Sequence, residues 1–376
     1  MKNLEQSRSS QQDQQRMLEA LAYAKANTVR TSPNPKVGCV IYDSNGHLLA
    51  QGVTSPPGGP HAEVNAINAA KKAGHSLKNA IVYVTLEPCS HTGRTGPCTL
   101  ALIREQVARV CIGTGDPNPL VAGRGIKALS EANIAVTTQV AEEHCKAHHE
   151  PFFKWISTGK PWVSLKGAMT LDGCLATANG HSNWITGIEA RTHVHQLRAR
   201  VDAMMVGGET ARRDRPSLTV RHCEGSDPQA IAISKTLSIP NDAPFLRPGT
   251  ILLHGQEASE ERKASLEDLG AKLIELPEHS SGKGLDLNHG LLALGSLGIT
   301  HLCVEGGGFL HGAFLQDQLV DDVHLYIAPR LIGRGKPLFN FSSVNTIHDG
   351  ITLEETVTQT LGPDLYLYGK TRYPNT

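Results

Sequence analysis

One histidine and two cysteines, carried by two short motifs, are the residues of this sequence best suited to bind a metal ion. His61 lies in Pro-His-Ala-Glu-Val, and eight residues separate Cys89 from Cys98. One imidazole and two thiolates suit a borderline-soft ion such as zinc. Three protein ligands leave the fourth position of a tetrahedral zinc for water, which a catalytic site requires. The sequence therefore predicts a zinc site at His61, Cys89 and Cys98.

Glu63 follows His61 by two residues, at the start of a predicted helix. A carboxylate there can reach a water beside the metal without being a ligand, take its proton and pass it to a leaving amine. His-x-Glu followed by Pro-Cys and a second Cys is the signature of zinc nucleobase deaminases, although two residues usually separate their cysteines. A structural zinc, or buried cysteines without a metal, is the alternative interpretation.

A second group of metal-type side chains has no further partner set nearby in the sequence. It comprises His144, Cys145, His148 and His149, close to an expected domain boundary. We expect these residues to be solvated or packed in a core.

Three glycine-containing motifs stand out in the second half of the chain. They are the segments 166–173, 207–210 and 305–309, each at the end of a predicted strand. Glycine lets the backbone approach a phosphate closely, and a following helix offers its free N–H groups. The turn at Gly306, Gly307 and Gly308 therefore suits a pyrophosphate, although it lacks the Gly-x-Gly-x-x-Gly pattern. A tight strand-to-helix turn is the alternative.

The elements that position these motifs alternate between strands and helices, which predicts an α/β layered fold. In the first half we expect strands at 36–42, 47–52, 80–86, 109–113 and 134–137, and helices at 17–26, 62–73, 98–105 and 125–132. In the second half we expect strands at 161–168, 203–206, 229–233, 251–253, 272–276, 301–304 and 323–328, and helices at 187–200, 259–269 and 285–297. A boundary near residue 148 divides the chain into domains 1–148 and 149–376.

Composition fits an enzyme acting on small molecules. The 376 residues contain 36 Lys and Arg and 36 Asp and Glu, and this neutral balance argues against a nucleic-acid partner. An 18-residue apolar run is absent, so we expect no membrane span. Residues 1–16 lack the apolar region of a secretory signal, and eight cysteines are too few for a disulfide scaffold. We therefore expect a cytoplasmic protein with a frayed N-terminal tail.

From about residue 17 to the C-terminus, the chain resembles the bifunctional deaminase/reductase family of riboflavin biosynthesis. The long spacing of the cysteines is usual in that family. The motifs that carry the resemblance are Pro33-Asn34-Pro35-Lys36-Val37-Gly38, Pro60-His61-Ala62-Glu63-Val64, Leu86-Glu87-Pro88-Cys89-Ser90-His91, Gly93-Arg94-Thr95, Asp116-Pro117-Asn118-Pro119, Val121-Ala122-Gly123-Arg124-Gly125, Leu171-Asp172-Gly173, Ser182-Asn183-Trp184-Ile185-Thr186 and Val304-Glu305-Gly306-Gly307.

The resemblance implies a cytidine-deaminase-like three-layer domain followed by a dihydrofolate-reductase-like domain. The first would hydrolytically deaminate 2,5-diamino-6-ribosylamino-4(3H)-pyrimidinone 5′-phosphate with zinc, and the second would reduce the ribosyl group to ribityl with NADPH. It also implies a homo-oligomer formed through the reductase domain.

The resemblance further assigns residues to ligands. Zinc would be bound by His61, Cys89 and Cys98, with Glu63 as the catalytic proton shuttle. NADPH would contact Ala168, Trp184, Thr210, Asp214, Gly307, Gly308, Phe309, Leu310, His311, Gly312 and Ala313. Substrate would contact Asn34 and His91 in the deaminase, and Ser182, Arg198, Leu218, Arg221 and Glu305 in the reductase. The two arginines suit a phosphate, although a surface charge is the alternative for each. Lys166 is a further polar candidate.

Three departures from the family pattern affect these assignments. Val53-Thr54 replaces a usual Tyr-His pair, so one substrate-contacting histidine is missing. Arg215 stands where a second Asp is frequent. Ser234-Lys235 replaces a Val-Asp-Ser-type strand end, and Lys235 could contact a cofactor phosphate, although we favour a solvated strand end.

Two other functions compete with this one. A deaminase acting on tRNA or another nucleobase, with an accessory nucleotide-binding domain, would use the same zinc and Glu63. A structural zinc module fused to a nucleotide-binding domain would have no activity that depends on Glu63.

Overall fold

The computed structural model describes residues 2–90, 96–119, 121–282 and 284–374. The chain forms two compact units, Met1–Gly159 and Lys160–Thr376. The expected division after residue 148 falls inside helix α5 (Glu142–Thr158), which ends at a left-handed Gly159. Pro151 does not break this helix, because the buried side chains of Cys145, His149 and Phe152 keep it packed in the first unit. The structure therefore divides the chain later than the sequence suggests.

The first unit is built on one five-stranded sheet with the order β2-β1-β3-β4-β5. β1 pairs antiparallel with β2 and β3, and β3, β4 and β5 are parallel. Helices cover both faces, which explains why β1 is buried along its whole length and reads as an apolar run. The strands are β1 (Gly38–Tyr42), β2 (Leu48–Val53), β3 (Ile81–Leu86), β4 (Arg109–Thr114) and β5 (Ala135–Thr137).

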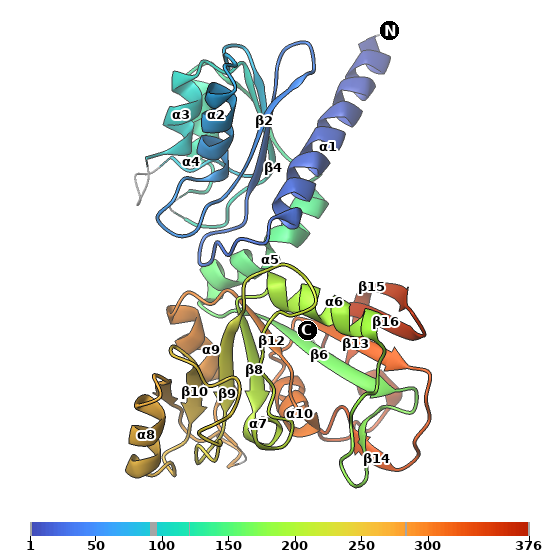
Figure 1. Cartoon of the computed structure of the whole chain (residues 1–376). Coiled ribbons are helices and arrows are strands. Elements are labelled where there is room, and N and C mark those ends of the chain that lie inside the picture. Colours follow the sequence, from blue (N-terminus) through green and yellow to red (C-terminus); the bar gives the residue numbers. More distant parts are fainter. Residues whose placement is uncertain (1, 91–95, 120, 283, 375–376) are drawn as a thin grey trace. The chain divides into compact units, whose positions relative to one another are not determined.

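Helices α2 (Ala62–Lys72), α3 (Cys98–Arg104) and α4 (Arg124–Glu131) cover one face of this sheet, and α1 (Lys2–Ala26) covers the other (Figure 1). Every helix and strand expected in this half is present. Helix α1, however, begins at Lys2 rather than near residue 17. Asp13, in the stretch expected to be frayed, accepts hydrogen bonds from Tyr83 (2.7 Å) and Arg109 (2.5 Å) on the sheet. These buried polar contacts hold this turn of α1 against the sheet, although the turn has little apolar surface.

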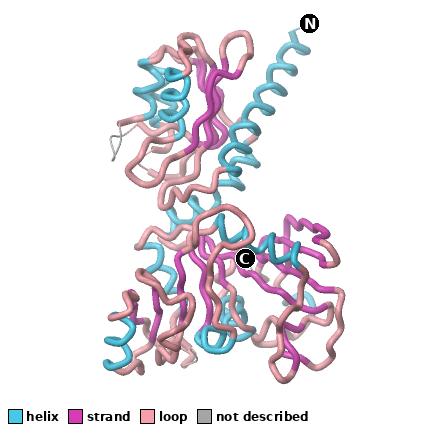
Figure 2. Tube along the Cα trace, viewed as in Figure 1, coloured by secondary structure: helices cyan, strands magenta, loops and turns pink. Residues whose placement is uncertain are grey.

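The second unit is built on a nine-stranded sheet with the order β11-β10-β9-β8-β12-β6-β13-β16-β15. The seven strands from β11 to β13 are parallel, and the hairpin β16-β15 continues the sheet antiparallel (Figure 2). The strands are β6 (Trp162–Thr170), β8 (Ala203–Gly207), β9 (Gln229–Ile233), β10 (Ile251–His254), β11 (Lys272–Glu275), β12 (His301–Val304), β13 (Asp322–Ala328), β15 (Thr352–Leu361) and β16 (Asp364–Arg372).

The remaining elements surround this sheet. They are α6 (Ile188–Arg200), α7 (Gly208–Arg213), α8 (Glu260–Glu267), α9 (Leu287–Ser296), α10 (Gly308–Gln316), the 3-10 turn η1 (Ile347–Asp349) and a small second sheet of β7 (Cys174–Thr177) and β14 (Gly335–Pro337). The expected elements are present, and Ser259 caps α8 as predicted by accepting from the Arg262 N–H. The hairpin β15-β16 was not expected from the sequence, because β15 is almost entirely exposed and therefore lacks an apolar alternation. Among the described residues, no helix combines the length and apolar character needed to cross a membrane.

Two candidate active sites

The predicted metal ligands converge in the first unit. His61 precedes α2 as its N-cap, Cys89 follows β3, and Cys98 is the first residue of α3. The His61 Nδ1 atom lies 3.5 Å from the Cys89 Sγ and 3.4 Å from the Cys98 Sγ. With ordinary Zn–S and Zn–N bond lengths, a tetrahedral zinc would separate nitrogen from sulfur by about 3.6 Å. The three residues therefore fit zinc, with His61 coordinating through Nδ1.

The surroundings of Cys89 stabilise its thiolate form. Hydrogen bonds from Cys98 and from His61 lower the pKa of Cys89 well below its usual value. The backbone N–H of Cys98 also points at the Cys89 Sγ, at 3.4 Å. Because a thiolate is the form that binds zinc, these donors favour the ligand state.

Glu63 lies beside these ligands, as predicted. It is the second residue of α2, is 4% exposed, and its carboxyl interacts with the thiol of Cys98. Burial raises the pKa of Glu63 to about 7, and the charge of a bound zinc would act in the opposite direction. A carboxyl group that titrates near neutrality can both accept and return a proton. The N-cap and the second residue of α2 therefore place a candidate metal ligand, His61, next to a candidate proton shuttle, Glu63.

Glu87 holds the segment that carries Cys89. Its buried carboxylate accepts hydrogen bonds from the backbone N–H groups of Gly123 (3.1 Å), Gly125 (3.0 Å) and Ile126 (3.4 Å) at the start of α4. A Cβ atom on Gly125 would lie 2.0 Å from the carbonyl oxygen of Pro88. These hydrogen bonds and this close packing therefore hold the motif Glu87-Pro88-Cys89 against the N-terminus of α4. This role of Glu87 was not predicted from the sequence, although a charged residue directly after a buried strand is a visible signal of it.

The loop before β1 surrounds Asn34. The carbonyl of Asn34 accepts from the Thr31 hydroxyl at 3.0 Å. The hydroxyl of the buried Thr54, which replaces the expected histidine, accepts from the Val37 N–H at 3.0 Å. Thr54 therefore supports the backbone of this loop rather than reaching for a ligand. His91 lies outside the described residues.

The second group of metal-type residues is packed, as expected. His149 is buried and its Nε2 lies 3.1 Å from the Thr85 hydroxyl, while the Nε2 of His148 donates to the Lys36 carbonyl at 2.8 Å. Burial lowers the pKa of both histidines. Within the described part of the chain, His61, Cys89 and Cys98 are the one group placed to share a metal ion.

The second unit contains a cavity of about 1440 Å³. It lies at the carboxyl ends of β6, β8, β9 and β12, where residues such as Ala168, Gly207, Ser234 and Glu305 line it. Ligands of open α/β sheets bind at this edge. The volume is large enough for a dinucleotide and a second small molecule together.

Packing requires glycine at two positions in and after the glycine turn at this cavity. A Cβ atom would lie 2.5 Å from the Pro337 carbonyl oxygen at Gly308 and 1.8 Å from the Asn340 carbonyl oxygen at Gly312. The fully buried His311 accepts the Gly306 N–H through Nε2, at 2.9 Å. Burial lowers the pKa of His311 to about 4, so the ring stays neutral and able to accept. These contacts support the interpretation as a tight strand-to-helix turn, and a turn of this kind is compatible with phosphate binding.

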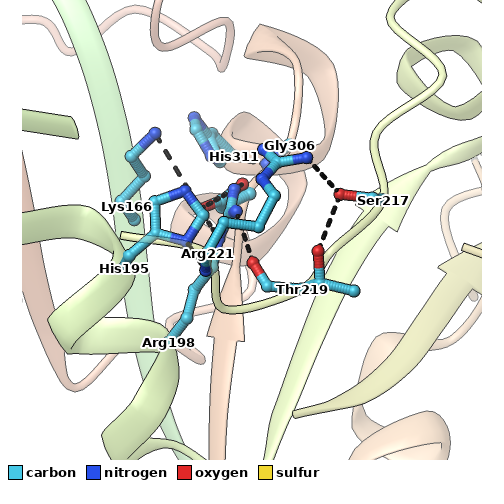
Figure 3. Close-up of polar contacts among 9 residues, drawn as sticks. Lys166, His195, Arg198, Ser217, Thr219, Arg221, Gly306 and His311 are labelled. Carbon is cyan, nitrogen blue, oxygen red and sulfur yellow. Dashed lines mark hydrogen bonds and ion pairs between the residues drawn. The ribbon is translucent and has the colours of Figure 1, made fainter. Parts of the chain in front are cut away.

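A buried ion pair lies next to this turn, because one of its members, Glu305, directly precedes Gly306. Figure 3 shows the basic residues Arg198 and Lys166 that approach this carboxylate. Arg198 donates from Nε (3.2 Å) and Nη2 (2.8 Å) to the two carboxylate oxygens of Glu305, and the Lys166 Nζ lies 3.9 Å from that carboxylate. Burial alone would raise the pKa of Glu305, but Arg198 and Lys166 lower it to about 2. The carboxylate is therefore ionised. Arg198 is buried against it, so the alternative that Arg198 is a surface charge is wrong.

Both units match known families. Residues 10–114 match the cytidine and deoxycytidylate deaminase zinc-binding region, and residues 161–367 match the RibD C-terminal domain. The chain is 37% identical over 362 residues to the riboflavin biosynthesis protein RibD of Aquifex aeolicus, covering 95% of this chain and 98% of that protein. The chain belongs to the RibD family.

Solved structures agree with this membership of the RibD family. Form 1 of Acinetobacter baumannii RibD matches with a TM-score of 0.85 and 34% identity, over 96% of this chain and 99% of that one. A diaminohydroxyphosphoribosylaminopyrimidine deaminase/5-amino-6-(5-phosphoribosylamino)uracil reductase from Thermotoga maritima matches with a TM-score of 0.84 and 28% identity, over 97% of this chain and 100% of that one. The expected fold, a cytidine-deaminase-like domain followed by a dihydrofolate-reductase-like domain, is confirmed.

The cavity collects most of the residues that the RibD resemblance assigned to the reductase. Those that line it are Ala168, Ser182, Thr210, Asp214, Glu305, Gly307, Gly308, Phe309, Leu310, His311, Gly312 and Ala313, together with Lys166. Trp184, Arg198, Leu218 and Arg221 do not line it. Trp184 is 66% exposed and stacks on Arg191, whose guanidinium carbon is 4.3 Å from the ring.

Lys235 and Arg215, the two basic residues that depart from the RibD pattern, have different surroundings. Lys235 lines the cavity, and its Nζ lies 3.0 Å from Glu257 and 2.9 Å from Glu278. Arg215 is exposed and pairs with Asp242 at 2.8 Å. His279 and Ser281 also line the cavity and were missed, because their polar loop reads only as exposed chain.

Proposed function

We propose that this member of the RibD family catalyses two successive steps of riboflavin biosynthesis. The first unit would deaminate 2,5-diamino-6-ribosylamino-4(3H)-pyrimidinone 5′-phosphate. The second unit would reduce the ribosyl group to ribityl with NADPH, giving 5-amino-6-(5-phosphoribitylamino)uracil. The observation that carries this proposal is the presence of a complete zinc ligand set beside a buried Glu63 in one unit and a dinucleotide-sized cavity in the other.

In the deaminase, His61, Cys89 and Cys98 would hold the zinc, which supplies a water of lowered pKa at the ring carbon that bears the amine. Glu63 would take a proton from this water as its oxygen bonds to the ring carbon, and would deliver the proton to the amino group, which would leave as ammonia when its C–N bond breaks. The buried position of Glu63 keeps solvent from competing for that proton. Asn34 and His91 would hold the pyrimidine.

In the reductase, NADPH would supply the hydride. The backbone at Gly307 and Gly308, at the N-terminus of α10, would face its pyrophosphate, with Ala168, Thr210 and Asp214 along the cavity wall. Ser182 and Glu305 would contact the substrate. Arg221, whose guanidinium is exposed, would bind the substrate phosphate, with Leu218 and Arg198 beside it.

Two broader properties belong to the same proposal. The chain would form a homo-oligomer through the reductase domain, where β15 presents a ten-residue edge strand whose outer side has no neighbour in the described sheet. Size-exclusion chromatography with light scattering tests this, and a monomer at micromolar concentration would contradict it. A cytoplasmic location is supported by the eight cysteines, all of which are free thiols.

The decisive experiment separates the two activities. Purified full-length protein should release ammonia from the diaminopyrimidine phosphate without NADPH, and should oxidise NADPH only when the deaminated product is supplied or formed. Glu63→Gln should abolish ammonia release and leave reduction of supplied product unchanged, while Glu131→Gln, at an exposed site of the same unit, should alter neither. Loss of both reactions in Glu63→Gln would contradict two independent sites.

A further inference from the structure

The segment 217–221, which follows α7 and ends at Arg221, has an unusual backbone conformation at Leu218. Leu218 has a φ angle of 52°, a left-handed backbone that costs energy for a side chain of this size, and its side chain is fully buried. The Ser217 hydroxyl lies 3.0 Å from that of Thr219 and accepts from the Arg221 guanidinium at 2.7 Å. Such a segment keeps its shape only if neighbouring elements hold it.

Helix α6 holds both ends of the short stretch 219–221 (Figure 3). Arg198 donates from Nη1 to the Thr219 carbonyl at 3.2 Å, and His195 accepts the Arg221 N–H through Nδ1 at 3.1 Å. His195 and Arg198 are three residues apart, so they share one face of the helix. The backbone of Arg221 is therefore fixed by His195 from the same helix that binds Glu305 through Arg198.

The contact with Arg221 requires a neutral His195, because Nδ1 must present a lone pair to the backbone N–H. His195 is 4% exposed, and its ring meets that of His222 edge to face at 4.6 Å. Burial, followed by the charges of Arg198, His222 and Arg221, lowers the pKa of His195 to about 4. The ring is thus an acceptor throughout the neutral range.

The charges around this segment favour an anion. Lys166 and Arg198 bring two positive charges to the single carboxylate of Glu305. Arg221 adds a third positive charge on the neighbouring segment, where its guanidinium donates to the Ser217 hydroxyl (Figure 3). The Arg221 guanidinium is exposed, whereas Arg198 is 9% exposed and occupied by Glu305. Of the two arginines, Arg221 is therefore the one positioned to bind an incoming phosphate.

We infer that His195 is a positioning residue for the substrate phosphate: its neutral imidazole fixes the backbone of Arg221 so that the guanidinium faces the phosphate. This inference rests on the proposed function, which assigns Arg221 to that phosphate. His195 itself touches neither the phosphate nor the reacting carbon, so its removal affects binding of the phosphorylated substrate and not the hydride transfer.

The test compares the phosphorylated aminouracil substrate with its dephosphorylated form, 5-amino-6-(ribosylamino)uracil, in the NADPH oxidation assay of the full-length enzyme. His195→Ala should raise KM for the phosphorylated substrate about tenfold, the effect of one hydrogen bond to a buried group. Its kcat, its Kd for NADPH and its KM for the dephosphorylated form should stay within twofold. Arg221→Ala should show the same pattern, and the double variant should lose little more than either alone.

Two conservative variants address folding. Asn places an acceptor near the position of Nδ1, so His195→Asn should restore KM to within about threefold of the wild type. Gln places its amide near Nε2, so His195→Gln should keep a polar side chain and yet resemble His195→Ala. Thermal unfolding of each variant shows whether the unit is intact.

The outcomes separate the inference from the function on which it rests. An equal loss on both substrates, a loss in kcat alone, or an Asn variant as impaired as Ala overturns the positioning role. If Arg221→Ala is impaired and His195→Ala is not, the role of His195 fails while the phosphate assignment stands. If Arg221→Ala is silent, both fail. If the wild type reduces neither substrate, the proposed function fails, and calorimetry with ribose 5-phosphate then decides whether His195 supports phosphate binding.

Discussion

Replacing Glu87 by Gln tests whether the zinc segment is held by α4. The carboxylate, 5% exposed, receives three backbone N–H groups at 3.0–3.4 Å. Gln keeps one oxygen for Gly125 and Ile126 but turns an NH₂ group toward the N–H of Gly123, so one buried donor loses its acceptor. The lost charge-assisted bond costs about 1.5–3 kcal/mol and the lost charge at the helix start about 0.3–1 kcal/mol. We therefore expect a destabilisation of about 2–4 kcal/mol.

Zinc release during urea unfolding, followed with a chelating dye, reports on the first unit alone. With an m-value of about 2 kcal/mol/M, this loss corresponds to a midpoint lower by about 1–2 M. Zinc affinity in the absence of urea should fall about tenfold or more, because Cys89 is displaced when Glu87 no longer holds its loop. Glu131→Gln is the matched control. It lies in α4 with an exposed side chain 3.8 Å from Lys127, so its effect should stay below about 0.5 kcal/mol.

The reasoning is refuted if Glu87→Gln releases zinc at the same urea concentration as the control and binds zinc with wild-type affinity. Loss of stability with unchanged zinc affinity would show that Glu87 supports α4 without positioning Cys89.

Three further predictions follow from the same geometry. Because the pKa of Glu305 is lowered to about 2 in the folded chain, its stabilising contribution is complete above its ordinary value of about 4.5 and is lost as pH falls from there toward 2. Acid unfolding of the second unit should therefore be steeper in the wild type than in Glu305→Gln, and parallel curves would contradict the ion pair. Gly312→Ala places a Cβ atom 1.8 Å from the Asn340 carbonyl oxygen, so it should displace α10 and weaken NADPH binding about tenfold or more in a fluorescence titration; an unchanged Kd would show that this helix does not set the cofactor site. Removal of zinc by a chelator should abolish ammonia release and leave the Kd for NADPH within twofold, whereas a parallel loss of both would contradict separate sites.

The sequence alone was sufficient for features whose chemistry is local. The zinc ligands could be named from residue type and spacing, because few combinations of His, Cys and Glu serve a catalytic zinc. Strands in a sheet that is covered on both faces appear in the sequence as apolar runs. For this reason the strands expected in both units could be predicted, and they are present in the structure. The glycine turn at residues 306–308 was visible because a run of three glycines stands out in the sequence, and at Gly308 the backbone of Pro337 leaves no room for a Cβ atom.

Contacts between distant segments were decided only by the tertiary structure. The sequence could not show that Arg198 is buried against Glu305, that His195 accepts the Arg221 N–H, or that Glu87 caps α4, since each contact joins segments 26 to 107 residues apart. It likewise missed the exposed hairpin β15-β16, whose pairing partners rather than its own pattern make it a sheet. Residue chemistry thus indicated the metal and the proposed proton shuttle, while packing decided which charges are paired and which arginine side chain stays exposed.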